Sequence, residues 1–377
     1  MERVSNGTRE SSKRKKWRRY LMANGGQWDP ISLPVRPGLY LNFVEAALAA
    51  ITGGPRGVVA LPLFNYTGGA AKSGEFYTIE GEADAVELFG SVNAKPVLNV
   101  LQGGAAEVLV YAVPELEATL QYVDIRDQYE ARPFNVFVYP QNVSPDEQDA
   151  TKAWVERNRE EGKHFAWVLG GTSEEDADPT VGNARSVRLK DKYIVNLIVG
   201  GITGAGDEIE SAVYATYIAG LIAGTPINKS ITYADLPLAD VNKRLKNSEI
   251  VTALTSGSLV LVNDGKTIKV EQGVTTDSDT SKRGKIRIMR ARQAVATDIP
   301  ETAKNRYIGK VDNNPAGQVA LISAIKAYLQ TLETNNVLMA PKVELDALRP
   351  SVGDSVFLAI SYVEVDSMER IFLTINV

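Results

Sequence analysis

The sequence predicts a multidomain protein of mixed α/β class. Its central part alternates apolar strands with helices, a pattern typical of a mostly parallel sheet covered by helices. Short apolar strands precede this part, and an amphipathic helix followed by two strands ends the chain. With 377 residues the chain can form two or three domains with their own cores. The predicted domains are a β-rich, β-sandwich-like domain over 46–125, an α/β domain over 126–273 and an α+β domain over 274–369.

The first 45 residues are not expected to form a domain core. Residues 1–22 carry eight Lys or Arg and two Glu, whereas the whole chain has a formal net charge of −5. This basic leader could be an arm for nucleic acid or a membrane surface, a solvated tail, or an artefact of start-codon choice. We favour the third interpretation because Met22 opens a segment typical of a natural N-terminus, so residues 1–21 are expected to be dispensable.

Residues 23–45 are interpreted as an N-terminal arm. Gly, Pro and Asn dominate its first part, which favours an extended chain over a packed helix. A short strand with strict alternation follows, and it places three apolar side chains on one face: Leu39, Leu41 and Phe43.

The two middle domains are predicted from apolar runs bounded by turn residues. In the first domain a turn enters a buried strand over 53–64, and a short helix and a second strand follow over 83–90 and 105–113. In the α/β domain, Ser144 and Pro145 begin a helix that has acids in its first turn. The other elements expected there are strands over 134–139, 164–171 and 193–201, a helix over 208–223, and a hairpin over 256–273 that turns at Asp264-Gly265.

The last domain combines one clear helix with two strands. Residues 286–299 alternate at first and then become ambiguous. A helix over 315–333 has an apolar stripe at helical spacing, and strands are predicted over 356–365 and 370–377. The stripe consists of Val319, Ile322, Ile325, Leu329 and Leu332. In the last strand Ile371, Leu373 and Ile375 share one face.

Composition excludes several classes of function. The chain has no cysteine, so disulfides, thiolate zinc sites and cysteine nucleophiles are impossible. Its single histidine, His164, leaves little scope for metal binding or general-base catalysis. The acidic body does not suggest binding to nucleic acid, because phosphate contacts need clustered positive charge. No apolar run reaches the roughly 18–20 residues of a membrane helix, and no signal peptide is recognised.

The remaining motifs favour structural interpretations. The glycine-rich segment 200–206 lacks the spacing and the lysine of a nucleotide loop, so we interpret it as a tight turn. His164 has no serine in a nucleophile-elbow pattern to pair with. The acidic run 174–178 lacks the spacing of a calcium loop, and Gly220 and Gly224 indicate close helix packing. We therefore predict no catalytic residue, no cofactor and no metal site.

The two terminal strands have another possible role. Each follows a loose connection, and an unprotected strand edge invites pairing with another chain. Such pairing supplies backbone hydrogen bonds and pockets for alternate side chains. From the pattern alone, pairing within the same subunit and pairing between subunits are equally supported.

Eight stretches in order along the chain carry a family resemblance: RPGLYLNF (36–43), GPRGVVALPL (54–63), VELFG (86–90), EVLVYAV (107–113), YIAGLIAGTPINKSITY (217–233), SEIVTALTSGSLVLV (248–262), YIGKVDNNPAGQVALISAIKAYLQTLE (307–333) and VDSMERIFLTINV (365–377). Together they resemble the tail sheath family of contractile bacteriophages, especially the compact prophage-type sheaths of Gram-positive bacteria. The resemblance runs from about Gln27 to Val377.

The resemblance implies a structural subunit and no enzyme. Its middle domain would resemble subtilisin in fold only, since a shared fold does not carry activity. Subunits would stack in rings around a tail tube, assemble in the host cytoplasm into a virion tail, and contact baseplate and tail terminator proteins. The arms, mapped to 36–45 and 370–377, would complete the sheets of neighbouring subunits, and contraction would drive the tube through the bacterial envelope. The alternatives are a non-contractile shell protein and, less favoured, an α/β hydrolase-like enzyme.

Overall fold

The computed structural model describes residues 56–64, 66, 69–114, 122–277 and 284–375. The chain divides into two compact units, Met1–Leu48 and Ala49–Val377, and all described residues belong to the second unit. The predicted basic leader and the N-terminal arm, with Leu39, Leu41 and Phe43, lie outside the described residues.

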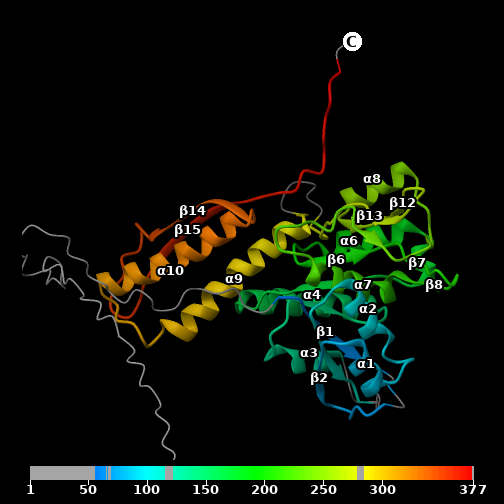
Figure 1. Ribbon diagram of the computed structural model, residues 1–377, viewed down its shortest axis with the longest axis horizontal. Coiled ribbons are helices and arrows are strands. Elements are labelled where there is room, and N and C mark those ends of the chain that lie inside the picture. The colour runs from blue at the N-terminus through cyan, green and yellow to red at the C-terminus, as the bar shows by residue number, and fades with distance from the viewer. Residues whose placement is uncertain (1–55, 65, 67–68, 115–121, 278–283, 376–377) are drawn as a thin grey trace, which may run out of the picture. The chain divides into compact units, whose positions relative to one another are not determined.

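A seven-stranded sheet forms the centre of the described unit (Figure 1). Its strand order is β11-β6-β5-β4-β1-β3-β2, with parallel pairing throughout except for β2, which is antiparallel to β3. The inner strands are buried along their length, as expected when helices cover both faces of a parallel sheet. The bounds are β1 Val58–Leu63, β2 Phe76–Ile79, β3 Glu107–Ala112, β4 Val136–Val138, β5 Ala166–Leu169, β6 Ile194–Leu197 and β11 Ser258–Leu259.

The predicted β-sandwich-like domain over 46–125 is not a separate sheet. β1 pairs with β3 on one side and with β4 on the other, where Val59 lies opposite Val136. The strands before and after residue 125 therefore share one sheet and one core. A buried apolar run specifies a strand but not its partner, so local patterns could not show that β1 would cross the predicted boundary.

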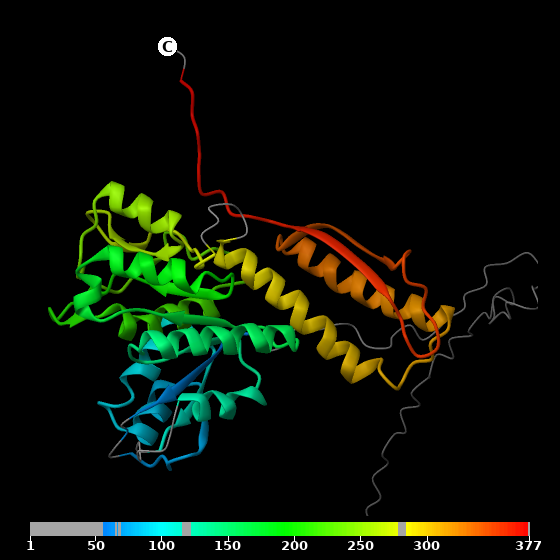
Figure 2. The same cartoon turned by 180° about the vertical axis from the view of Figure 1, so that it is seen from behind.

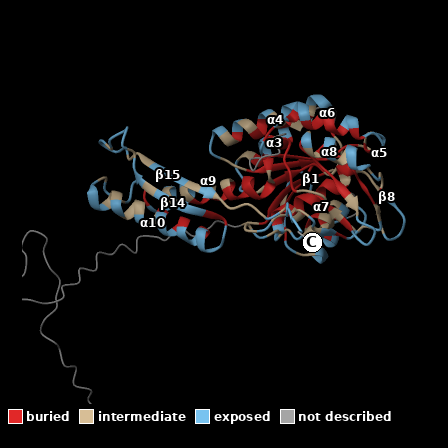
Figure 3. Cartoon of the chain, turned by 90° about the horizontal axis from the view of Figure 1, so that it is seen from above, coloured by how far each residue is buried: buried red, intermediate tan, exposed pale blue. Residues whose placement is uncertain are grey.

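Helices cover both faces of this sheet. Figure 3 shows the buried strands between α7 on one side and α3, α4 and α6 on the other. The predicted cap of α4 is confirmed, because Ser144 Oγ accepts a hydrogen bond from the backbone N–H of Glu147 at 3.3 Å. The bounds are α1 Glu82–Phe89, α2 Lys95–Gly103, α3 Tyr122–Glu130, α4 Pro145–Glu160, α5 Ser173–Asp176, α6 Pro179–Leu189, α7 Ser211–Gly224 and α8 Asn247–Thr255.

Helix α7 is buried on nearly every side and packs closely on α2. A Cβ added to Gly220 would lie 2.0 Å from the carbonyl oxygen of Val100, and one added to Gly224 would lie 1.9 Å from that of Gly104. The two glycines therefore allow the helix backbones to touch, which confirms the packing interpretation.

Two small sheets flank the main one. The first consists of β10 Asp240–Val241, β7 Gly201–Ile202 and β8 Glu208–Ile209, and the second of β12 Leu261–Asn263, β13 Ile268–Val270 and β9 Asp235–Leu236. The predicted hairpin turn is confirmed between β12 and β13, where Gly265 adopts a φ of 92° that favours glycine. The first residues of the predicted hairpin instead form β11 in the main sheet.

The C-terminal layer consists of α9 Ile286–Arg306, α10 Pro315–Thr334, β14 Leu338–Leu345 and β15 Leu358–Glu364 (Figure 2). The segment 286–299, whose sequence pattern was ambiguous, is the first part of one long helix. Arg287 and Arg290 occur where an apolar stripe should continue, but their guanidinium groups reach the carbonyl oxygens of Asn336 and Thr225. Long arginine side chains can occupy a buried helix face in this way, and this hides the helical period in the sequence.

The predicted amphipathic helix over 315–333 is confirmed as α10, which packs on the two-stranded sheet of β14 and β15. Its C-terminal half buries Ile325, Leu329 and Leu332 in a second core shared with α9 and β14. Val319, at the start of the predicted stripe, is 61% exposed. The apolar stripe thus extends toward the beginning of α10, past the part of the helix that other elements of the chain bury.

Candidate subunit-interface region

The two-stranded sheet of the C-terminal layer has open edges. β14 and β15 pair with each other and with no further strand of the described chain. Met339 lies opposite Val363, and these two apolar side chains are 48% and 50% exposed. A bulge between Met339 and Lys342 interrupts the register of β14. An edge strand presents backbone N–H and C=O groups with which a further strand can pair, so this layer offers a template for additional strands.

The C-terminal segment of the chain is extended and exposed. Backbone pairing ends where Val365 donates its N–H to the carbonyl oxygen of Val337. In Figures 1 and 2 the residues that follow leave the layer as a ribbon that is neither helix nor strand. The predicted strand is therefore not formed over its described residues 370–375, because an isolated extended segment has no partner for its backbone N–H and C=O groups.

The structure presents an apolar surface along this segment. The three predicted interface residues Ile371, Leu373 and Ile375 are 69%, 82% and 81% exposed. Phe372 is 90% exposed, and alternation did not predict it because it lies on the opposite face from the other three. A run of large exposed apolar side chains marks an interaction site in a folded protein.

A catalytic role for His164 finds no support among the described residues. His164 Nδ1 lies 3.2 Å from the hydroxyl of Tyr193. Burial, followed by the charges of Arg159 and Lys192, lowers the pKa of His164. The serine and aspartate side chains that a catalytic histidine would need bond elsewhere: Ser186 to Ser258, Ser211 to Asp176, Ser230 to Thr232, and Asp191 to Arg159.

The acidic run and the glycine loop have structural roles. Asp176 is buried and accepts hydrogen bonds from the backbone N–H of Ser211 and from Asn242, while Asp178 caps α6. The glycine loop is the tip of the β7–β8 hairpin and does not begin a helix, so it lacks the N-terminal amides that hold phosphate. No cluster of three potential metal ligands occurs within the described ranges.

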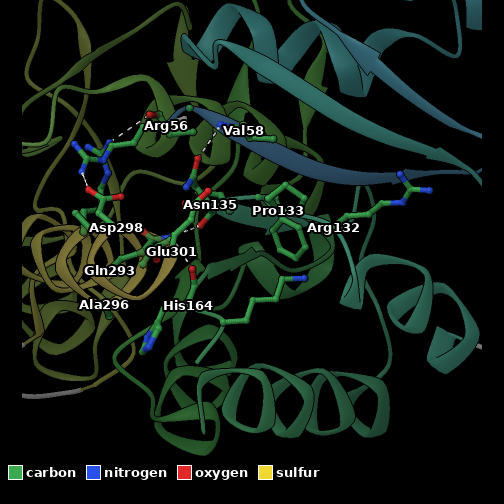
Figure 4. A pocket seen from close by; sticks show the side chains of 18 of the residues that line it. Arg56, Val58, Arg132, Pro133, Asn135, His164, Gln293, Ala296, Asp298 and Glu301 are labelled. Carbon is green, nitrogen blue, oxygen red and sulfur yellow. Dashed lines mark hydrogen bonds and ion pairs between the residues drawn. The ribbon is translucent and has the colours of Figure 1, made fainter. Parts of the chain in front are cut away.

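A cavity of about 590 Å³ lies against α9 and the turns that enter β1, β4 and β5 (Figure 4). In open α/β sheets ligands bind at the carboxyl ends of the strands, whereas this cavity lies at the amino ends. Gln293 Nε2 donates to the carbonyl oxygens of Asn135 and His164 at 2.9 and 3.0 Å. Arg56 forms an ion pair with Asp298, and both residues also line the cavity. These contacts connect α9 to the body of the protein.

An open two-stranded sheet and an exposed apolar terminus are features of a subunit that other chains complete. No helix in the described part of the chain is long and apolar enough to cross a membrane.

Comparison with known proteins identifies the family. The model of the phage tail sheath protein central domain matches residues 117–276, and that of the phage tail sheath C-terminal domain matches residues 278–377. The chain therefore belongs to the phage tail sheath family, and the prediction of a structural sheath protein rather than an enzyme agrees with this family.

Individual relatives support the same assignment. The tail sheath protein of Clostridium phage phiCD119 is 24% identical over 222 residues, which are 57% of this chain and 57% of that relative. The chain thus matches a little over half of the length of this relative. The fold is shared with a sheath tail protein from Desulfitobacterium hafniense, with a TM-score of 0.67, 17% identity, and coverage of 87% of this chain and 100% of that one. It is also shared with the helical sheath of the anti-feeding prophage in its contracted state, with a TM-score of 0.69, 15% identity, and coverage of 91% and 99%.

Proposed function

We propose that this chain is the subunit of a contractile tail sheath. It polymerises in stacked rings around a tail tube and contracts to drive the tube through the bacterial envelope. Family membership supports this proposal, and so do the fold neighbours that are a contracted helical sheath and a baseplate assembly. The expected partners are other copies of the chain, the tube protein, the baseplate and the tail terminator. Assembly takes place in the host cytoplasm, and the product is part of the virion tail.

The exposed C-terminal segment is the observation that carries this proposal. A folded subunit gains nothing from Ile371, Phe372 and Leu373 while they remain 69–90% exposed. When the segment joins a sheet in another subunit, its backbone groups become paired and its alternate side chains become buried. The segment therefore acts as an arm, and we call residues 370–377 the C-terminal arm.

The sheet of β14 and β15 in a neighbouring copy is the acceptor for this arm. It has the open edges that strand addition requires, since β14 and β15 pair with no further strand of the described chain. The exposed pair Met339 and Val363 supplies an apolar surface on its outward face. By sequence pattern, the strand with Leu39, Leu41 and Phe43 is proposed to add to a neighbouring sheet in the same manner.

We also propose that helix α10, or the loop leading into it, lies near the inner wall of the sheath and faces the tube. Lys326, Gln330 and Glu333 are exposed along one side of the helix, and Val319 is exposed near its beginning. A sheath map that placed α10 on the outer surface would exclude this orientation.

Electron microscopy of the purified full-length protein tests the proposed assembly. Tubes with the form of a contracted sheath are expected, whereas closed shells would favour the non-contractile alternative and persistent monomers would contradict both.

Chemical cross-linking tests the proposed acceptor sheet. The chain has no cysteine, so a Leu373→Cys variant and a Val363→Cys variant can be mixed and treated with a short bismaleimide. Cross-linked dimers are expected in the assembled mixture. A Val92→Cys variant, whose exposed residue precedes α2 in the body of the protein, replaces Val363→Cys as the control and is expected to give few dimers.

A further inference from the structure

The C-terminal arm begins at a buried carboxylate. The side chain of Glu369 is only 8% exposed, whereas Ile371, two residues later, is 69% exposed. Glu369 Oε2 accepts a hydrogen bond from Gln272 Nε2 at 2.7 Å. Its Oε1 accepts one from Thr232 Oγ1 at 2.9 Å. Groups from two separate segments thus hold the carboxylate of the residue directly before the arm.

A positive charge from Lys285 completes this site. Lys285 Nζ lies 2.9 Å from Glu369 Oε2 and donates to Asp366 Oδ2 at 2.7 Å. Its side chain is 12% exposed, and the residue is the N-cap of α9. Ser367 Oγ adds a hydrogen bond of 3.0 Å to Glu369 Oε1. We call Lys285, Asp366 and Glu369, with Thr232 and Gln272, the arm anchor.

The free energy of folding does not explain why the arm anchor exists. Removing charges from water costs free energy that their mutual attraction often fails to recover, so buried ion pairs contribute little net stability. Their geometry is nevertheless specific, because several directed donors converge on one carboxylate. Glu369 lies between the end of β15 at Glu364 and the run of exposed apolar residues that begins at Ile371, and it thus stands directly before the arm.

We propose that Glu369 and Lys285 are positioning residues, which fix the point and direction from which the C-terminal arm reaches a second copy of this chain. This inference rests on the proposed function. An extended chain spans about 3.3–3.6 Å per residue, so the eight residues of the arm reach roughly 26–29 Å from the anchor. A fixed starting point restricts the arm to the acceptor edges within that reach, which raises the effective concentration of the arm at its acceptor sheet.

The anchor can be tested in the isolated subunit by spin labelling. Met368 is 83% exposed beside Glu369, and a Met368→Cys variant gives a unique attachment site because the chain lacks cysteine. A slow, restricted label is expected in this background, and Glu369→Ala is expected to make it markedly faster. Glu160→Ala, at the exposed end of α4, serves as the control and should leave the label unchanged. Equal label mobility with and without Glu369 would overturn the proposal.

Assembly gives the second readout. Full-length Glu369→Ala is expected to keep its cooperative melt and to need at least about tenfold more protein to form tubes. If its assembly concentration equals that of the unchanged chain, the anchor does not position the arm. If deletion of the whole arm also leaves tubes intact, the proposed arm exchange itself fails. Should Glu369→Ala lose its cooperative melt, Glu369→Gln, which retains the side-chain size, takes its place in both measurements with the same expected results.

Discussion

Deletion of residues 370–377 distinguishes two hypotheses about the arm: that it pairs with a neighbouring subunit, and that it packs in the core of its own subunit. The described residues of this segment bury little in their own chain, since Ile371, Phe372, Leu373 and Ile375 are 69–90% exposed. Changes at exposed positions usually alter stability by no more than about 0.5 kcal/mol. The truncated chain should therefore melt cooperatively at nearly the same temperature as the full chain.

The same deletion should abolish assembly. A fully buried Leu or Ile contributes roughly 1.5–3 kcal/mol, so three alternate side chains of one arm contribute several kcal/mol before the cost of ordering the chain is subtracted. One arm alone would hold a weak dimer. In a closed ring several such contacts act on each subunit together, so removal of every arm should prevent tubes from forming.

Circular dichroism and sedimentation together provide the assay. A cooperative melt with loss of large particles supports arm exchange. A point variant refines the test: Leu373→Asp should impair assembly, whereas Val92→Asp, at another strongly exposed apolar position, should assemble normally. If the truncated chain unfolds, the arm belongs to its own subunit's core. If it still forms tubes, the arm does not join the subunits, and the reasoning is refuted.

Three further predictions concern the body of the protein and its anchor. Gly220→Ala should lower the melting temperature despite the better helix propensity of alanine, because the added Cβ would lie 2.0 Å from a carbonyl oxygen of α2. Gly204→Ala is the control, because its added Cβ would have no heavy atom within 4 Å, and it should be nearly neutral in the same thermal melt. Asp298→Ala should destabilise the fold by about 1–3 kcal/mol, because Asp298 accepts hydrogen bonds from Arg56 and from the buried hydroxyl of Tyr328. Urea titration measures this, and an unchanged midpoint of the unfolding transition would contradict the prediction. Burial alone would raise the pKa of Glu369, but hydrogen bonds from its partners, led by that of Lys285, outweigh burial and lower the pKa below the ordinary value for glutamate. The contribution of the anchor is therefore fully present above the unfolded-state pKa and is lost as pH falls through the folded-state pKa. A label at Met368 should become faster on acidification, and a line shape that stays constant until the whole protein unfolds in acid would oppose this.

Local patterns predicted the individual elements of this fold better than their arrangement. Buried strands such as β4, β5 and β6 were correctly placed because each is an apolar run that is bounded by turn residues and too short for a buried helix. The shared sheet on the two sides of residue 125 was not predicted, because the partner of β1 is decided by packing across the whole sheet. The beginning of α9 was ambiguous because its arginines are buried through contacts with distant backbone carbonyls.

The interface region was predictable in part. Alternation identified Ile371, Leu373 and Ile375 as an apolar face, and the structure shows these side chains exposed. The anchor was not predictable, because Glu369, Lys285 and Gln272 are distant in sequence and each is an ordinary surface residue by type. A cluster of this kind becomes visible only when the fold brings its members together.

The contrast between the anchor and the arm is the strongest structural argument for exchange. A terminus that merely frays would be expected to lose side-chain contacts gradually toward its end. Here Glu369 makes several directed polar contacts, and two residues later the side chains are almost fully exposed and predominantly apolar. An apolar surface of this kind is unfavourable in water unless another surface covers it, and the subunit itself holds the arm away from its own core. We therefore propose that a neighbouring copy supplies the cover, since its open two-stranded sheet has the complementary unpaired groups.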